Sequence, residues 1–194
     1  MTIEFLSNEL LNLGPATKEN RDRVANIVLE NIECFPMLLQ LTFQANDKVS
    51  VKAAWILEWI CTHYGIDYLS DYLEEFTSQL SKLKLDSAIR PCAKLCEQIA
   101  ICSDMSTDNP IKSRLTSQQI ERIVETGFDW LITPQKIAVR AYTMNTLFLF
   151  GKNIDWIHNE LSHIIRTKII HESKGCKARG KHVINAIEKH SQRL

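Results

Sequence analysis

The feature that most constrains this chain is a pattern that returns four times along its 194 residues. In each copy a small or apolar residue precedes a basic one, and apolar residues follow at helical spacing. The basic residues are 38, 50 and 39 positions apart and are Lys52, Arg90, Arg140 and Arg179. A period near 40 residues is typical of stacked helical units, because one unit alone cannot bury its apolar face.

A second amphipathic segment precedes each copy of the pattern. Residues 69–80 show it plainly, with Leu69, Leu73, Phe76 and Leu80 spaced three or four positions apart. These segments predict four helix pairs joined by short polar turns such as 45–47. The pairs span about residues 37–65, 69–103, 120–152 and 156–190. The interval around Pro110 predicts a loop insertion at about 103–117, and another helix at about 17–31 caps the first pair.

The pattern resembles the HEAT repeat, in which a turn Asp is followed by apolar, any, apolar, Arg or Lys, and later Ala. The best copy is Asp47 with Val51-Lys52-Ala53-Ala54. Asp86 with Ile89-Arg90 is the second, whereas the third copy has Gln135 in place of the Asp. The resemblance covers nearly the whole chain from about residue 17. It implies an all-α fold, a right-handed α-α superhelix of the armadillo type, in a single domain over residues 1–194.

The chain as a whole also resembles a group of small bacterial HEAT-like proteins that are often named adenylosuccinate lyase. That lyase is more than twice as long. Its flexible catalytic loop, which bears Ser, Met and Lys, has no counterpart here. The sequence also lacks a phosphate-binding Gly loop and a G-x-S-x-G motif. The resemblance therefore implies an architecture, and no enzyme activity is expected.

Composition favours a folded protein, with 45% apolar and 24% charged residues. The formal net charge is +0, so no global field attracts nucleic acid. Residues 1–97 hold 9 Lys and Arg against 14 Asp and Glu, whereas residues 98–194 hold 14 against 9.

No signal peptide and no apolar run of membrane-spanning length is found, so we expect a cytoplasmic protein without a membrane partner.

The potential metal ligands are not grouped in a usual pattern. None of the six cysteines forms a C-x-x-C pair, and we expect reduced, mostly buried thiols. Cys92 and Cys96 share a helix face, but no further ligand completes a set at the usual spacing. The five histidines of the C-terminal third are expected to be solvated: His158, His163, His171, His182 and His190. No metal and no cofactor are predicted.

The basic residues of the repeat allow two interpretations, which are compatible in part. Each cation braces stacked turns by pairing with a turn Asp such as Asp47 or Asp86, or the cations line a concave binding groove. Trp59 is the tryptophan expected at that concave surface, while Trp55, Trp130 and Trp156 are expected in the core. The candidate binding residues are Lys52, Trp59, His63, Arg90, Lys94, Arg140 and Arg179.

Residues 166–193 form the clearest electrostatic feature, with eight Lys and Arg against two Glu. Its candidate binding residues are Arg166, Lys168, Lys174, Lys177 and Lys181. Two interpretations explain these basic side chains. They belong to a solvated terminal helix, or they form a binding site for an acidic partner or a phosphate backbone.

These features favour a non-catalytic scaffold or adaptor that binds a protein or peptide partner through its concave surface. The alternative is a DNA-binding or alkylation-repair-like helical-repeat protein, with the repeat cations, Trp59 and an acid such as Glu58 or Asp129 at the DNA. Zero net charge counts against duplex binding.

Overall fold

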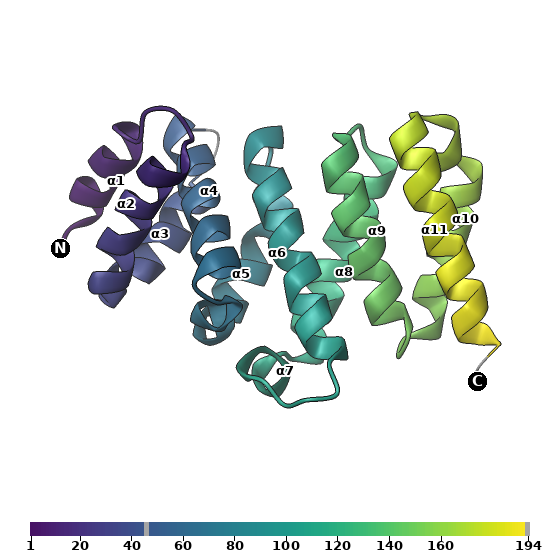
Figure 1. Cartoon of the computed structure of the whole chain (residues 1–194). Helices are drawn as coiled ribbons and strands as arrows, with labels where there is room; N and C mark the ends of the chain where they lie inside the picture. Colours follow the sequence, from purple (N-terminus) through teal and green to yellow (C-terminus); the bar gives the residue numbers. More distant parts are fainter. Residues whose placement is uncertain (45–46, 193–194) are drawn as a thin grey trace. The chain divides into compact units, whose positions relative to one another are not determined.

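A computed structural model describes residues 1–44 and 47–192, and these contain helices and no strand. The expected turn at 45–47 therefore lies mostly outside the described residues. Figure 1 shows the helices in chain order. Their bounds are α1 Ile3–Leu11, α2 Lys18–Glu30, η1 Ile32–Cys34, α3 Phe35–Thr42, α4 Lys48–His63, η2 Ile66–Tyr72, α5 Leu73–Gln79, η3 Leu80–Lys82, α6 Asp86–Asp104, α7 Pro110–Arg114, α8 Ser117–Ile132, α9 Ile137–Gly151, α10 Asp155–Thr167, η4 Ile169–His171 and α11 Lys174–Ser191.

The chain divides into two compact units, residues 1–95 and 96–194, and the division falls inside α6. In the first unit α4 packs against α1, α2 and α3, and in the second α9 packs against α8, α10 and α11. Both central helices bury an apolar face, for example Ile56 and Ile60 of α4 and Leu147 of α9. The expectation of one repeat domain stays a prediction.

The predicted helix pairs coincide with helices of the structure, with three differences. Helix α1 is additional, and α7 lies within the expected loop insertion. Residues 69–80 are not one α-helix, since 3-10 turns flank the short α5 on both sides. Leu69, Phe76 and Leu80 are nevertheless fully buried. Spacings of three and four residues occur on one face of an α-helix and of a 3-10 helix. The pattern therefore predicted the buried face correctly without showing which of the two helices forms.

Polar side chains fix where several helices begin. Thr17, Asp47 and Ser173 each accept a hydrogen bond from a backbone N–H in the first turn of the helix that follows. Thr116 and Gln119 form a reciprocal capping box at the start of α8. Thr116 is therefore the residue that caps α8.

No single helix among the described residues is long and apolar enough to cross a membrane. One sharply bent pair, residues 18–30 with 32–42, passes the same test on length and composition.

Candidate functional site

Trp59 is the centre of a polar and aromatic cluster on α2 and α4. Its indole Nε1 donates a 2.8 Å hydrogen bond to Oδ1 of Asp22, and the Tyr64 hydroxyl donates to the same oxygen at 3.1 Å. The hydrogen bond from Trp59 is the main cause of the lowered pKa of the Asp22 carboxyl. Burial, followed by the contact with Asp22, raises the pKa of Tyr64. A charged Asp22 therefore holds both aromatic side chains in place.

Two further side chains contact the face of the Trp59 ring. The His63 ring stacks on it with centroids 3.6 Å apart, and the Arg21 guanidinium lies 5.1 Å from the indole centroid. Trp59 is partly exposed and His63 is exposed. The structure thus presents an aromatic side chain whose orientation is fixed by neighbours from both helices.

A charge network lies next to Trp59 in sequence, within the first unit. Glu58 accepts a 2.7 Å hydrogen bond from Lys94, and Arg90 lies 3.8 Å from its other oxygen. The Arg90 side chain is 47% exposed, whereas that of Glu58 is only 13% exposed. The network joins α4 to the first half of α6 and leaves two cations accessible. We call these residues, together with Arg21, Asp22, Trp59, His63 and Tyr64, the Trp59 face.

Two side chains of α4 donate hydrogen bonds to backbone carbonyls elsewhere in the first unit. Lys52 donates a 2.8 Å hydrogen bond to the Leu11 carbonyl at the end of α1. Trp55, which was expected in the core, is only half-buried and donates to the Ser87 carbonyl near the start of α6 at 3.2 Å. Lys52 binds a backbone oxygen rather than a turn aspartate because the last carbonyls of a helix have no partner within the helix.

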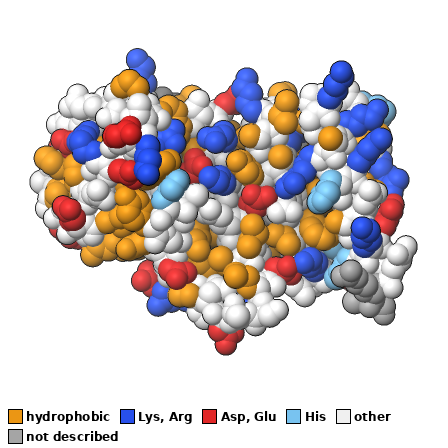
Figure 2. Space-filling model, in the orientation of Figure 1, with side chains coloured by type: hydrophobic (Ala, Val, Ile, Leu, Met, Phe, Trp, Pro, Cys, Tyr) orange, Lys and Arg blue, Asp and Glu red, His pale blue; other side chains and the backbone are white. Residues whose placement is uncertain are grey.

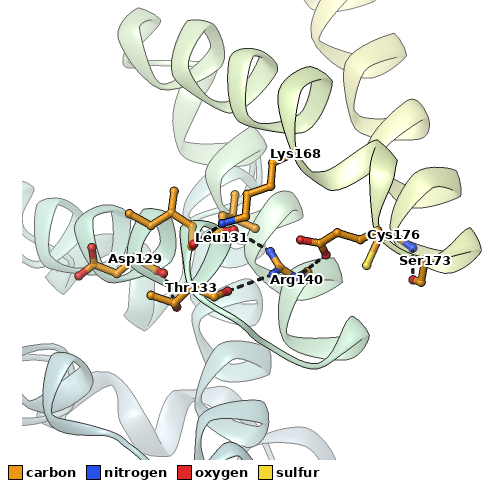
Figure 3. A network of polar contacts seen from close by, with 9 residues as sticks. Asp129, Leu131, Thr133, Arg140, Lys168, Ser173 and Cys176 are labelled. Carbon is orange, nitrogen blue, oxygen red and sulfur yellow. Dashed lines mark hydrogen bonds and ion pairs between the residues drawn. The ribbon is translucent and has the colours of Figure 1, made fainter.

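Arg140 is a buried connector and not a groove residue. Its residue surface is 3% exposed, and its guanidinium donates to the carbonyls of Leu131 at 2.6 Å and Thr133 at 3.0 Å. Its Nε also lies 2.9 Å from a carboxylate oxygen of Glu172, in the turn before α11. Figure 3 shows Arg140 between these groups. The geometry matches the bracing interpretation, but the acid is a glutamate of the following helix pair.

Arg179 and the basic patch belong to the second unit. Arg179 lies 3.5 Å from Glu97, and Arg166 pairs with Glu188 at 2.9 Å. Lys168 donates to the Ile132 carbonyl at the end of α8 (Figure 3). The remaining lysines of the patch, Lys174, Lys177 and Lys181, are exposed on α11. Figure 2 shows basic side chains over this helix. Arg193 lies outside the described residues.

Three expectations about aromatic and thiol side chains have different outcomes. Trp130 is buried at 6% exposure, but Trp156 is 53% exposed and stacks on Phe128 at 5.6 Å, so its expected burial was wrong. Trp156 is the second residue of α10, and the apolar periodicity of this helix does not show how far its first turn is covered. All six cysteines are free thiols and five are buried. Burial raises the pKa of Cys61 and Cys96.

His158 is buried at 8% exposure, so the expectation that it is solvated was wrong. Its Nε2 lies 2.8 Å from the Phe148 carbonyl, and its ring stacks on that of Phe148. Burial lowers the pKa of His158, an effect that the Phe148 hydrogen bond and Asp155 oppose and His190 and Lys152 support. His163, His171 and His182 are exposed as expected.

The lowered pKa of His158 predicts how stability depends on pH. The unfolded chain binds a proton at His158 near its ordinary pKa of 6.5, whereas the folded chain resists protonation. Stability contributed by the neutral ring is therefore complete above about pH 6.5 and is lost as the pH falls through that value toward the folded-state pKa. Urea unfolding of the wild type and His158→Gln at pH 7.5 and 5.5 measures this. The wild type should lose more stability on acidification, and equal losses would contradict the assignment.

Sequence reasoning missed Asp22, Arg21 and Tyr64, which hold Trp59. Asp22 is 37 positions from Trp59, in a helix expected only to cap the stack.

Within the described residues no three His, Cys, Asp or Glu side chains are grouped so as to hold a metal ion. No protein-family model matches the chain, and searches of curated proteins and of solved structures found no match.

Proposed function

We propose that this protein is a non-catalytic scaffold that binds a protein or peptide segment on the Trp59 face. The observation that carries the proposal is the fixed, partly exposed Trp59 with an exposed His63 stacked on it and accessible cations nearby. Trp, Tyr and Arg are the side chains that most often dominate binding energy at protein interfaces. Because Asp22 and Arg21 already orient the indole, a partner loses little entropy in ordering it.

The architecture that we propose for this function is a superhelix of HEAT-like helix pairs. The support is local: in the first unit α2 packs on α4, and in the second α9 packs on α11. Helices α9 and α11 are the second helices of neighbouring predicted pairs, and α2 is the predicted cap against the second helix of the first pair. Second helices line the concave side of such a stack. The partial matches to the HEAT pattern at Lys52, Arg90, Arg140 and Arg179 also support it.

Selection of peptides on the folded protein tests the Trp59 face. Twelve-residue peptides are selected on the wild type, and their dissociation constants are measured by fluorescence anisotropy. We expect Trp59→Ala to weaken binding about thirtyfold or more, the effect of losing a central aromatic anchor. Circular dichroism confirms that the variant is folded.

Trp156→Ala is the matched control, because it removes an exposed tryptophan of the second unit. It should leave the dissociation constants within about twofold of the wild type. If none of the selected peptides loses affinity in Trp59→Ala, or if affinity falls only in Trp156→Ala, the proposal is contradicted.

DNA binding is the second candidate function, and the exposed Lys174, Lys177 and Lys181 on α11 favour it. If these lysines contact phosphates, affinity for a 20-base-pair duplex falls steeply with salt. Replacing all three with alanine then reduces the slope of log K against log salt by about 2.7, since each phosphate contact contributes about 0.9. A duplex that fails to bind at low salt eliminates this candidate.

A further inference from the structure

A groove of about 840 Å³ lies in the first unit between α1, α3 and the η2–α5 segment. None of its lining residues belongs to the Trp59 face. Its apolar part includes Leu39, Phe43 and Tyr72. The volume is within the range of about 300–1,000 Å³ that is usual for pockets that bind small ligands.

Carboxamide side chains line the groove alongside the apolar residues. Asn8 of α1, and Gln40 and Gln44 of α3 and its C-terminal turn, make no side-chain hydrogen bond within the part of the chain that the structure describes. A carboxamide offers two donors and an acceptor, which match the N–H and C=O groups of a peptide backbone. These three side chains are therefore available to an extended chain laid in the groove.

The charge of the groove is of one sign. Glu4 of α1 and Glu75 of α5 are exposed, and no Lys or Arg is among the lining residues. Neither carboxylate forms an ion pair within the described residues. The first unit as a whole is acidic, with 13 Asp and Glu against 9 Lys and Arg in residues 1–95. An occupant that carries cations at two points is therefore complementary to the groove.

We propose that this groove binds an extended basic peptide segment. An apolar side chain of the peptide packs on Leu39 and Phe43, its backbone bonds the carboxamides, and two Lys or Arg side chains pair with Glu4 and Glu75. A small polyamine satisfies the carboxylates but leaves the apolar floor and the carboxamides unused. The site is independent of the Trp59 face, since the two share no residue.

Fluorescein-labelled heptapeptides test the proposal. Each has a central leucine and two arginines, whose separation is scanned from two to six positions, and a matched set carries glutamates instead of arginines. We expect one arginine spacing to bind best and the glutamate set not to bind. The double variant Glu4→Gln/Glu75→Gln should weaken the best peptide about tenfold at low salt, the effect of losing two exposed ion pairs. The side-chain amide resonances of Gln40 and Gln44 should shift on binding.

Glu19→Gln/Glu30→Gln is the control, since it makes the same charge change on α2 outside the groove and should leave the affinity unchanged. Trp59→Ala should also bind these peptides normally, which separates this site from the proposed function. Three results overturn the proposal: equal affinity in both double variants, binding of the glutamate set, or displacement of the peptide by spermine without any shift of the Gln40 and Gln44 amides.

Discussion

Replacing Arg140 with alanine is expected to lower the free energy of unfolding of the second unit by about 2–4 kcal/mol, because the change removes a buried guanidinium and leaves two carbonyls without their donors. Glu172 then has no counter-charge, and the carbonyls of Leu131 and Thr133 lose their donors at the end of α8. Urea unfolding measures the loss. Hydrogen exchange should show faster opening of amides in α8, α9 and the turn before α11.

The reason for so large an effect is that one guanidinium serves three acceptors from two helix pairs. Arg140→Lys keeps the charge but supplies a compact ammonium group in place of the planar fork. Its loss should be smaller, about 1–3 kcal/mol. Lys177→Ala removes a cation from the exposed side of α11 and should change stability by less than about 0.5 kcal/mol. If Arg140→Ala is as mild as Lys177→Ala, Arg140 does not hold the helix pairs together.

Gly151→Ala is expected to destabilise the second unit by about 2–4 kcal/mol, through overpacking and a disturbed buried hydrogen bond. A Cβ built on Gly151 lies 2.6 Å from Nε2 and 3.0 Å from Cγ of His158. The ring has no free space, since it is stacked on Phe148 and bonded to the Phe148 carbonyl. It must move, and the carbonyl then loses its partner. Thermal and urea unfolding measure the cost.

A double-mutant cycle separates this clash from the general effect of adding a methyl group to α9. In the His158→Ala background, Gly151→Ala should cost less than about 1 kcal/mol, because the ring is gone. Gly175→Ala is a second control, since the nearest atom to its Cβ is in the Ile137 side chain at 3.3 Å and the Ser173 hydroxyl is 3.9 Å away. That variant should stay within about 1 kcal/mol of the wild type. Equal costs of Gly151→Ala in both backgrounds contradict the packing argument.

The helices themselves could be predicted from the sequence because apolar periodicity is a local property. The predicted ranges 37–65, 120–152 and 156–190 cover most of the pairs α3 with α4, α8 with α9, and α10 with α11, whose ends lie one to three residues outside them. Helix α1 was missed although Leu6 and Leu10 are fully buried at the spacing of a helix face. Its nine residues supply too few turns for a repeating pattern to be recognised.

The candidate site could be predicted only in part. Trp59, His63, Arg90 and Lys94 were selected from their positions on two helices. The structure stacks His63 on Trp59 and pairs Arg90 and Lys94 with Glu58, whereas their role in binding stays a prediction. The groove that contains Glu4 and Glu75 was not foreseen, because its residues come from three short helices with no shared motif. A groove is the surface that the surrounding helices leave uncovered. The residue pattern of a single helix therefore cannot predict it.

The sequence by itself determined that the described chain is helical and which face of most helices is apolar. Tertiary structure alone decided which neighbour covers each face and which charges meet. Arg140 and Arg179 occupy the same position of the repeat pattern, yet Arg140 is 4% exposed at its side chain and Arg179 is 36% exposed. Periodicity is set by residues within one turn of each other, whereas burial of a charge depends on acceptors such as Glu172, which is 32 positions away from Arg140.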